Sequence, residues 1–162
     1  MASNAKPPYG GTVYRSGAQG PDVALIQTWL NGARSRWPAI QRLTVDGKYG
    51  SATATAVKTF QRLAGVRDDG VVGPDTWDKL YEVYAGLHGA GEVYPGISMR
   101  QGHTGATVKS AQQKLQTLVP ALQADGKYGP RTEAAVRAYQ GINDLAVDGV
   151  LGSKTWASLY DA

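Results

Sequence analysis

The chain has 162 residues, of which 42% are hydrophobic and 19% are charged, a composition that supports a buried core and excludes a disordered chain. It contains no cysteine, so disulfide frameworks, thiolate zinc sites and cysteine nucleophiles are excluded. The net charge of +4 favours anionic partners in general, and no apolar stretch approaches the roughly 20 residues that span a membrane.

Residues 1–8 lack the apolar core of a signal peptide, and we expect them to be a flexible leader or tag. Beyond them, apolar residues recur at the 3.6-residue helical period in three stretches of the first half, which predicts three helices. These stretches are marked by Val23, Ile26 and Leu30, by Ala56, Val57, Phe60 and Leu63, and by Trp77, Leu80, Tyr81 and Tyr84. No run of strand-like alternation competes with them.

The second half of the chain repeats the first. Arg15 opens one copy and Arg100 the other, and residues 46–50, with the sequence Asp-Gly-Lys-Tyr-Gly, recur unchanged as residues 125–129. The helical pattern returns at Val108, Ala111, Leu115 and Leu118, at Ala135, Val136 and Tyr139, and at Trp156, Leu159 and Tyr160. A duplicated three-helix unit explains this register, and the first copy is longer between its first and second helices.

A shorter motif, D-G-x-x-G-x-x-T, occurs four times, each time before a helical pattern. Its copies begin at Asp46, Asp69, Asp125 and Asp148. The Asp can accept hydrogen bonds from nearby backbone amides, the following Gly tolerates positive φ, and the second Gly can cap a helix. Pro74 and Pro130 directly follow that second Gly, at the helix position where proline is favoured. The motif therefore predicts a turn that leads into a helix.

The segment from Gly86 to Gly96 is rich in glycine and contains Pro95, so the boundary between the copies falls there. We place the first module at residues 9–86, a linker at residues 87–93 and the second module at residues 94–162. A module of about 80 residues is close to the lower limit for folding without disulfides or metal, so each copy needs good packing.

The ordered series R-x-G-x-x-G-x-x-V, x-Q-x-x-L, D-G-x-x-G-x-x-T, A-V-x-x-[FY]-Q and D-G-x-x-G-x-x-T-W occurs in both copies. It resembles the peptidoglycan-binding domain 1 family over nearly all of each copy. The resemblance implies an all-α protein of two tandem three-helix modules without cofactors. It also implies a role in holding a wall-degrading or wall-remodelling enzyme on peptidoglycan, with no chemistry of its own. One departure is the long connection at residues 31–45 of the first copy.

Catalysis is not expected from this chain. The four Asp residues of the turns could suggest glycosidase carboxylates, but a local hydrogen-bonding role in a repeated turn explains them better. A zinc hydrolase needs three protein ligands, whereas the chain has only His88 and His103, both in glycine-rich stretches. No nucleophile elbow, phosphate-binding loop or H-E-x-x-H motif occurs. We therefore predict no catalytic residues and no metal.

The first turn of each copy is the candidate ligand site. Its residues are Arg15, Lys48 and Tyr49 in the first copy and Arg100, Lys127 and Tyr128 in the second. Partly exposed tyrosine rings could pack against a sugar, while the cations could bind stem-peptide carboxylates. The alternatives are a core role for the tyrosines and, for the two arginines, pairing with an Asp of the same module.

Trp37 lies in the long connection among Arg34, Arg36 and Arg42, and this basic cluster with one aromatic residue could bind an anionic wall polymer or nucleic acid. The alternative is a solvated loop with Trp37 folded inward. No nucleic-acid module matches, so we expect no such partner. Trp77 and Trp156 lie on the apolar stripes of the third helices, which predicts core positions.

The predicted function is non-catalytic binding of peptidoglycan, through its glycan or its stem peptide, by a monomer outside the cytoplasm at the wall or spore. Two linked sites on a polymeric ligand would gain from effective concentration. Two alternatives are a protein-protein scaffolding module with the same fold and the targeting fragment of a cell-wall hydrolase, and a hydrolase could also be a separate partner.

Overall fold

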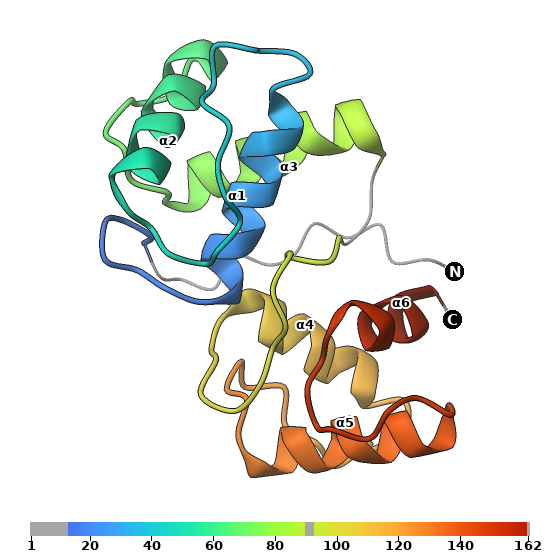
Figure 1. Ribbon diagram of the computed structural model, residues 1–162. Coiled ribbons are helices and arrows are strands. Elements are labelled where there is room, and N and C mark those ends of the chain that lie inside the picture. The colour runs from blue at the N-terminus through green and yellow to red at the C-terminus, as the bar shows by residue number, and fades with distance from the viewer. Residues whose placement is uncertain (1–12, 90–92, 162) are drawn as a thin grey trace.

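The computed structural model describes residues 13–89 and 93–161, which form two groups of three helices (Figure 1). The helices are α1 (Pro21–Ala33), α2 (Ser51–Ala64), α3 (Pro74–His88), α4 (Ala106–Leu115), α5 (Pro130–Ile142) and α6 (Ser153–Asp161). We call α1–α3 with their loops module 1 and α4–α6 module 2. The expected leader and the middle of the expected linker lie outside the described residues. The predicted helices are confirmed, and α3 continues to His88, beyond the expected boundary at residue 86.

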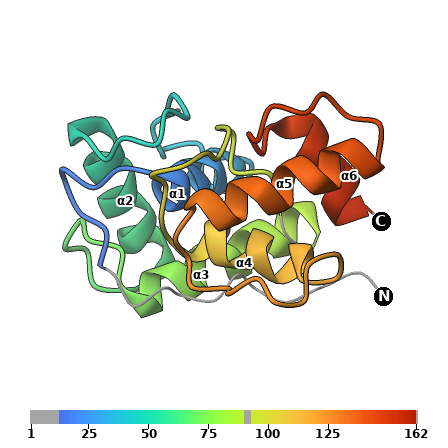
Figure 2. The same cartoon turned by 90° about the horizontal axis from the view of Figure 1, so that it is seen from below.

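The described residues contain isolated β-bridges and no strand. The bridges join Tyr14 with Val72, Gln19 with Lys48, Met99 with Leu151 and Thr104 with Lys127, so both modules pair corresponding segments. This supports the duplication. The two groups of helices are arranged so that α2 and α6 lie at opposite ends of the molecule (Figure 2).

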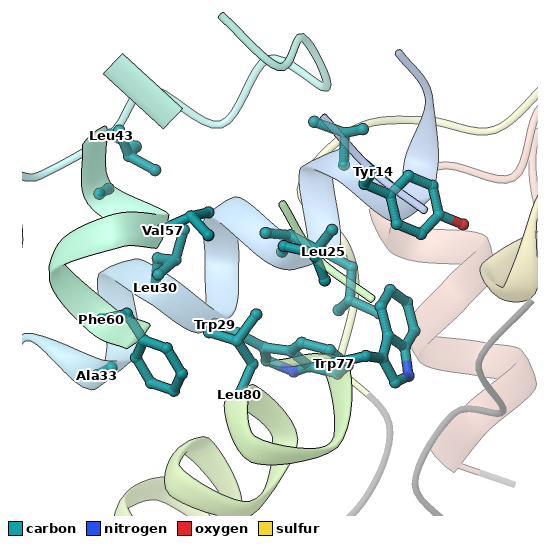
Figure 3. Packing of buried hydrophobic residues seen from close by; sticks show 14 of the residues in the cluster. Tyr14, Leu25, Trp29, Leu30, Ala33, Leu43, Val57, Phe60, Trp77 and Leu80 are labelled. Carbon is teal, nitrogen blue, oxygen red and sulfur yellow. The ribbon is translucent and has the colours of Figure 1, made fainter. Parts of the chain in front are cut away.

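Module 1 has an aromatic core. Trp29 of α1 and Trp77 of α3 are almost fully buried, and their rings meet edge to face with centroids 5.0 Å apart. Tyr14 stacks on Trp77 at 5.9 Å, and Phe60 of α2 packs at the other end of the cluster (Figure 3). The predicted core position of Trp77 is confirmed. Such large rings supply much of the apolar burial that a small module needs.

Module 2 has a smaller core built on Met99, Leu115, Val136 and Leu151. Trp156 is 6% exposed and belongs to this core, as predicted. Its ring stacks on Tyr160 with centroids 3.8 Å apart. Each module thus has its own hydrophobic cluster, which is the physical basis for treating the chain as two modules.

Each D-G-x-x-G-x-x-T turn is held by a buried glutamine from the preceding helix. In the first turn, the Gln27 amide nitrogen donates to Asp46 Oδ1, the Lys48 carbonyl and Thr53 Oγ1 at 3.0–3.1 Å. The Gln27 carbonyl oxygen accepts from the Gly47 amide at 2.9 Å. Gln61, Gln112 and Gln140 repeat this arrangement, which we call the glutamine clasp.

The predicted turn chemistry is confirmed in detail. Gly47 and its three counterparts have φ between 71° and 77°. Gly50, Gly73 and Gly129 cap helices α2, α3 and α5, and Pro74 and Pro130 are first helical residues. The turns are therefore rigid supports for the helices that follow them.

The two modules meet through corresponding helix starts. Asp22, in the first turn of α1, is 2% exposed and accepts hydrogen bonds from the Ala106 and Thr107 amides at 2.8 and 2.9 Å and from Thr107 Oγ1 at 2.7 Å. The Tyr14 hydroxyl donates to the same carboxylate. A Cβ at Gly105, where φ is +130°, would lie 2.5 Å from this carboxylate, so only glycine fits. Asp22 thus caps a helix of the other module.

Candidate functional site

Backbone pairing brings the opening segment of each module against its first turn. The Gly17 amide donates to the Tyr49 carbonyl, and the Tyr49 amide donates to the Ala18 carbonyl, both at 2.9 Å. In module 2, the same pair of bonds joins Gly102 and His103 to Tyr128. The segments that carry the candidate cations Arg15 and Lys48, and likewise Arg100 and Lys127, are therefore neighbours in space.

The tyrosines of the first turns are buried. Tyr49 and Tyr128 are 2% and 3% exposed, and their hydroxyls donate to the carbonyls of Gly70 and Gly149 at 2.6 and 2.8 Å. Burial raises the pKa of both phenols well above its usual value. The expectation that these rings are partly exposed is wrong, because each ring packs in the core and ties the first turn of its module to the second. Placed in this way, neither ring offers a face to a sugar.

The four candidate cations are exposed: Arg15, Lys48, Arg100 and Lys127. Within residues 13–89 and 93–161, no ion pair joins any of them to a carboxylate. The alternative in which either arginine pairs with an Asp of its own module is therefore not what the described residues show. These side chains are available to an anionic ligand.

The turn carboxylates are held ionised. The Lys48 amide and the Gln27 side chain donate to Asp46, and together they hold the pKa of that carboxyl below its usual value. Asp125 is held in the same way by the Lys127 amide and Gln112. A general acid would need a raised pKa. This environment fits the predicted structural role of the turn aspartates.

A polar cleft of about 350 Å³ lies where the modules meet, and we call it the inter-module cleft. Module 1 lines it with Gln19, Gly20, Asp46, Gly47 and Lys48, and module 2 with Ile97, Gly102, His103 and Thr104. Burial and the nearby Arg100 lower the pKa of His103, which favours the neutral ring at pH 7. Because the Arg100 amide donates to Nδ1 at 3.3 Å, the ring proton is on Nε2.

Lys127, the counterpart of Lys48, lines a different hollow of about 340 Å³. That hollow lies wholly in module 2, between the first turn and the start of α5, and includes Leu122 and Arg131. The structure therefore separates the two candidate lysines: Lys48 faces the other module, whereas Lys127 does not.

Trp37 lies on a third surface. It is half-buried, meets Phe60 edge to face at 5.7 Å and lies under the Arg36 guanidinium at 4.7 Å from its ring centre. Trp37 and Arg36 line a hollow of about 160 Å³, and none of the first-turn residues lines it. Arg34 is a loop support, because its Nε donates to the Ile40 carbonyl at 2.9 Å. The structure does not bring Trp37 to the turn-centred site.

Sequence reasoning missed the buried Asp22 and considered His103 only as a zinc ligand. Asp22 sits in the first turn of a helix, where an acid is ordinary, so the sequence carries no signal of its partner in the other module. No group of three or more His, Asp or Glu side chains that could hold a metal occurs in the part of the chain that the structure describes. In the same part, no helix is both long and apolar enough to cross a membrane.

Comparison with known proteins gives matches over most of the chain. The family described as "Putative peptidoglycan binding domain" matches residues 19–80 and 104–159. The N-acetylmuramoyl-L-alanine amidase CwlL of Bacillus licheniformis is 34% identical over 92% of the chain, and a probable N-acetylmuramoyl-L-alanine amidase of the same organism is 30% identical over 92%. The chain spans 45% of the length of each. The crystal structure of the SleB N-terminal domain is 28% identical over 48% of the chain and 99% of that domain, with a TM-score of 0.41.

Proposed function

The chain belongs to the peptidoglycan-binding domain family, and from this premise we propose that it binds bacterial cell-wall peptidoglycan without a catalytic step of its own. The observation that carries the proposal is the family match to two segments that together account for most of the chain. In this role the protein holds a hydrolase on the wall, either as the targeting part of a longer chain or as its partner.

The amidase relatives support the targeting role. They are longer than this chain, which spans 45% of their length, so the relatives contain sequence beyond the matched modules. The turn carboxylates of this chain are fixed as acceptors for backbone amides and glutamines, which suits a support and not an acid catalyst. Wall binding would place the protein outside the cytoplasm, at the wall or spore. We propose further that it acts as a monomer and that nucleic acid is not a partner.

The four exposed cations are the residues that we assign to peptidoglycan carboxylates: Arg15, Lys48, Arg100 and Lys127. An unpaired, exposed cation meets a carboxylate with little desolvation cost, and each such contact is weak. Several of them on one polymeric ligand strengthen binding together. Trp37, with Arg36 above it, is a proposed additional contact on its own surface.

Co-sedimentation with purified, teichoic-acid-free sacculi tests this function. We expect the full chain to pellet, and the double variant Lys48→Ala/Lys127→Ala to pellet less at equal concentration. A matched control, Lys58→Ala/Lys154→Ala, removes the same charge from exposed positions outside the first turns and should pellet like the unmodified chain.

If the unmodified chain stays in solution, peptidoglycan binding is the wrong function, and a protein-protein scaffolding role takes its place. If the two double variants pellet equally, the chain binds the wall but the assignment to the first turns is wrong.

A further inference from the structure

The two modules are fixed relative to each other by several contacts around the inter-module cleft. In addition to the Asp22 cap, Thr28 Oγ1 donates to the Pro95 carbonyl at 2.9 Å. A Cβ at Gly47 would lie 3.0 Å from Ile97 Cδ1, and one at Gly96 would lie 2.6 Å from Val45 Cγ1. The first turn of module 1 therefore packs closely against the opening of module 2. Fixed contacts between the two modules therefore form the cleft.

The amides at the start of α4 are used within the protein. The Ala106 and Thr107 amides both donate to Asp22, so this helix terminus is already neutralised by a buried carboxylate. An anion that enters the neighbouring cleft must be met by side chains. The cation that lines the cleft is Lys48, which is exposed. Its charge acts on the nearby Asp46, but among the described residues no ion pair at contact distance joins Lys48 to a carboxylate.

Apart from Ile97 and Asp46, the other cleft side chains are neutral hydrogen-bond donors and acceptors. His103 carries its proton on Nε2, and Gln19 and Thr104 are exposed polar residues. Ile97 adds an apolar side chain, and Asp46 adds a carboxylate. One cation opposed by one carboxylate does not suit a polyanion such as a phosphate polymer. A single carboxylate on a ligand rich in hydroxyl and amide groups matches this set better.

We propose that the inter-module cleft binds a carboxylate-bearing segment of peptidoglycan, a muramyl peptide, as one site shared by the two modules. Lys48 pairs with a carboxylate of the stem peptide. His103 Nε2 and Thr104 Oγ1 donate to its amide or sugar oxygens, and Ile97 packs against an apolar edge. This inference rests on the proposed function, and it names the part of the polymer and the site that take part.

Within the described residues the site occurs once, because the residues that form it are not all repeated in the other module. The residue of module 1 that corresponds to His103 is Ala18, and Lys127 lines a hollow within its own module. A second copy of the cleft would need a third module after module 2. Binding of a small muramyl peptide at this site should therefore show a stoichiometry of one per chain.

Calorimetric titration of the full chain with N-acetylmuramyl-L-alanyl-D-isoglutamine tests the proposal, with tri-N-acetylchitotriose as a ligand that lacks carboxylates. We expect one site per chain for the muramyl peptide. Lys48→Ala and His103→Ala should each lower the affinity for the muramyl peptide about three- to tenfold, as expected for the loss of one exposed charged or polar contact. Lys154→Ala removes an exposed charge elsewhere and should leave the affinity unchanged.

Lys127→Ala changes the corresponding lysine of module 2, which lies outside the cleft. It should weaken binding of the muramyl peptide less than Lys48→Ala does. Equal losses for Lys48→Ala and Lys127→Ala, or no loss for Lys48→Ala, would overturn the shared cleft. Preferred binding of the uncharged chitotriose would overturn the proposal that the cleft recognises a carboxylate. In either case, sacculi that still pellet the chain leave the proposed function intact, whereas loss of both kinds of binding removes function and cleft together.

Discussion

The two modules keep the same turns and differ in their cores. All four glutamine clasps share the bonds from the side-chain amide nitrogen to the Asp, a backbone carbonyl and the Thr, and the bond from the Gly amide. The large aromatic core of module 1, in contrast, has no counterpart in module 2. Trp29 packs edge to face on Tyr81 at 5.9 Å, and at the corresponding place in module 2 the Lys114 ammonium lies 5.3 Å above the Tyr160 ring. The polar turns therefore define this fold, while the residues that pack between the helices can change.

The core difference predicts the largest effect. Trp29→Ala should destabilise module 1 by about 3–5 kcal/mol, because it removes a fully buried ring and leaves a cavity. Lys114→Ala, at the corresponding position, should cost less than about 1 kcal/mol, because it removes a partly exposed cation from an aromatic face. Urea denaturation followed by circular dichroism measures both, and equal costs would contradict the comparison.

The glutamine clasps predict similar effects in the two modules. Gln27→Ala and Gln112→Ala each leave buried turn groups without partners, including the amides of Gly47 and Gly126. We expect each to cost about 2–3 kcal/mol, the penalty for leaving buried polar groups unsatisfied. Thermal unfolding of the two variants checks this. A large difference between them would show that the turns are not the shared support.

The inter-module contact predicts a smaller change. Asp22→Ala removes the acceptor for three donors of module 2 and should cost about 1–2 kcal/mol, in the range of a lost helix cap. Because each module has its own core, both should stay helical while their relative orientation loosens. Small-angle scattering, compared with Asp75→Ala as a control in the first turn of α3, detects this loosening, and an unchanged scattering profile would contradict it.

The first turns of the two modules should contribute the same pH dependence of stability. The folded-state pKa of Asp46 and Asp125 is lowered, so their stabilising contribution is present above about pH 3.9 and is lost as the pH falls further. The folded-state pKa of Tyr49 and Tyr128 is raised, so their contribution is full below about pH 10 and is lost as the pH rises above it. A melting temperature that stays constant both below about pH 3.9 and above about pH 10 would contradict these shifts.

The repeat and the turns could be predicted from the sequence because their chemistry is local. Asp46, Gly47 and Gly50 lie within a few residues of the groups they support, and Pro74 marks a helix start by its own geometry. The helical period likewise placed Trp77 in the core.

The rest depended on contacts between distant residues. The sequence places Tyr49 in the first turn, but its hydroxyl donates to the Gly70 carbonyl of the second turn. Asp22 bonds to a helix of the other module, and no local pattern indicates that partner. The exposed cations were found, but their division between the inter-module cleft and a hollow within module 2 follows from how the modules pack.

Non-catalytic binding of peptidoglycan is tested most simply by a binding isotherm of the full chain on teichoic-acid-free sacculi, with the supernatant assayed for released muropeptides. We expect saturable binding that is weakened by Lys48→Ala/Lys127→Ala, with no release of soluble fragments at any protein concentration. Absence of saturable binding would contradict peptidoglycan recognition, and release of muropeptides that rises with time and protein concentration would contradict a non-catalytic role.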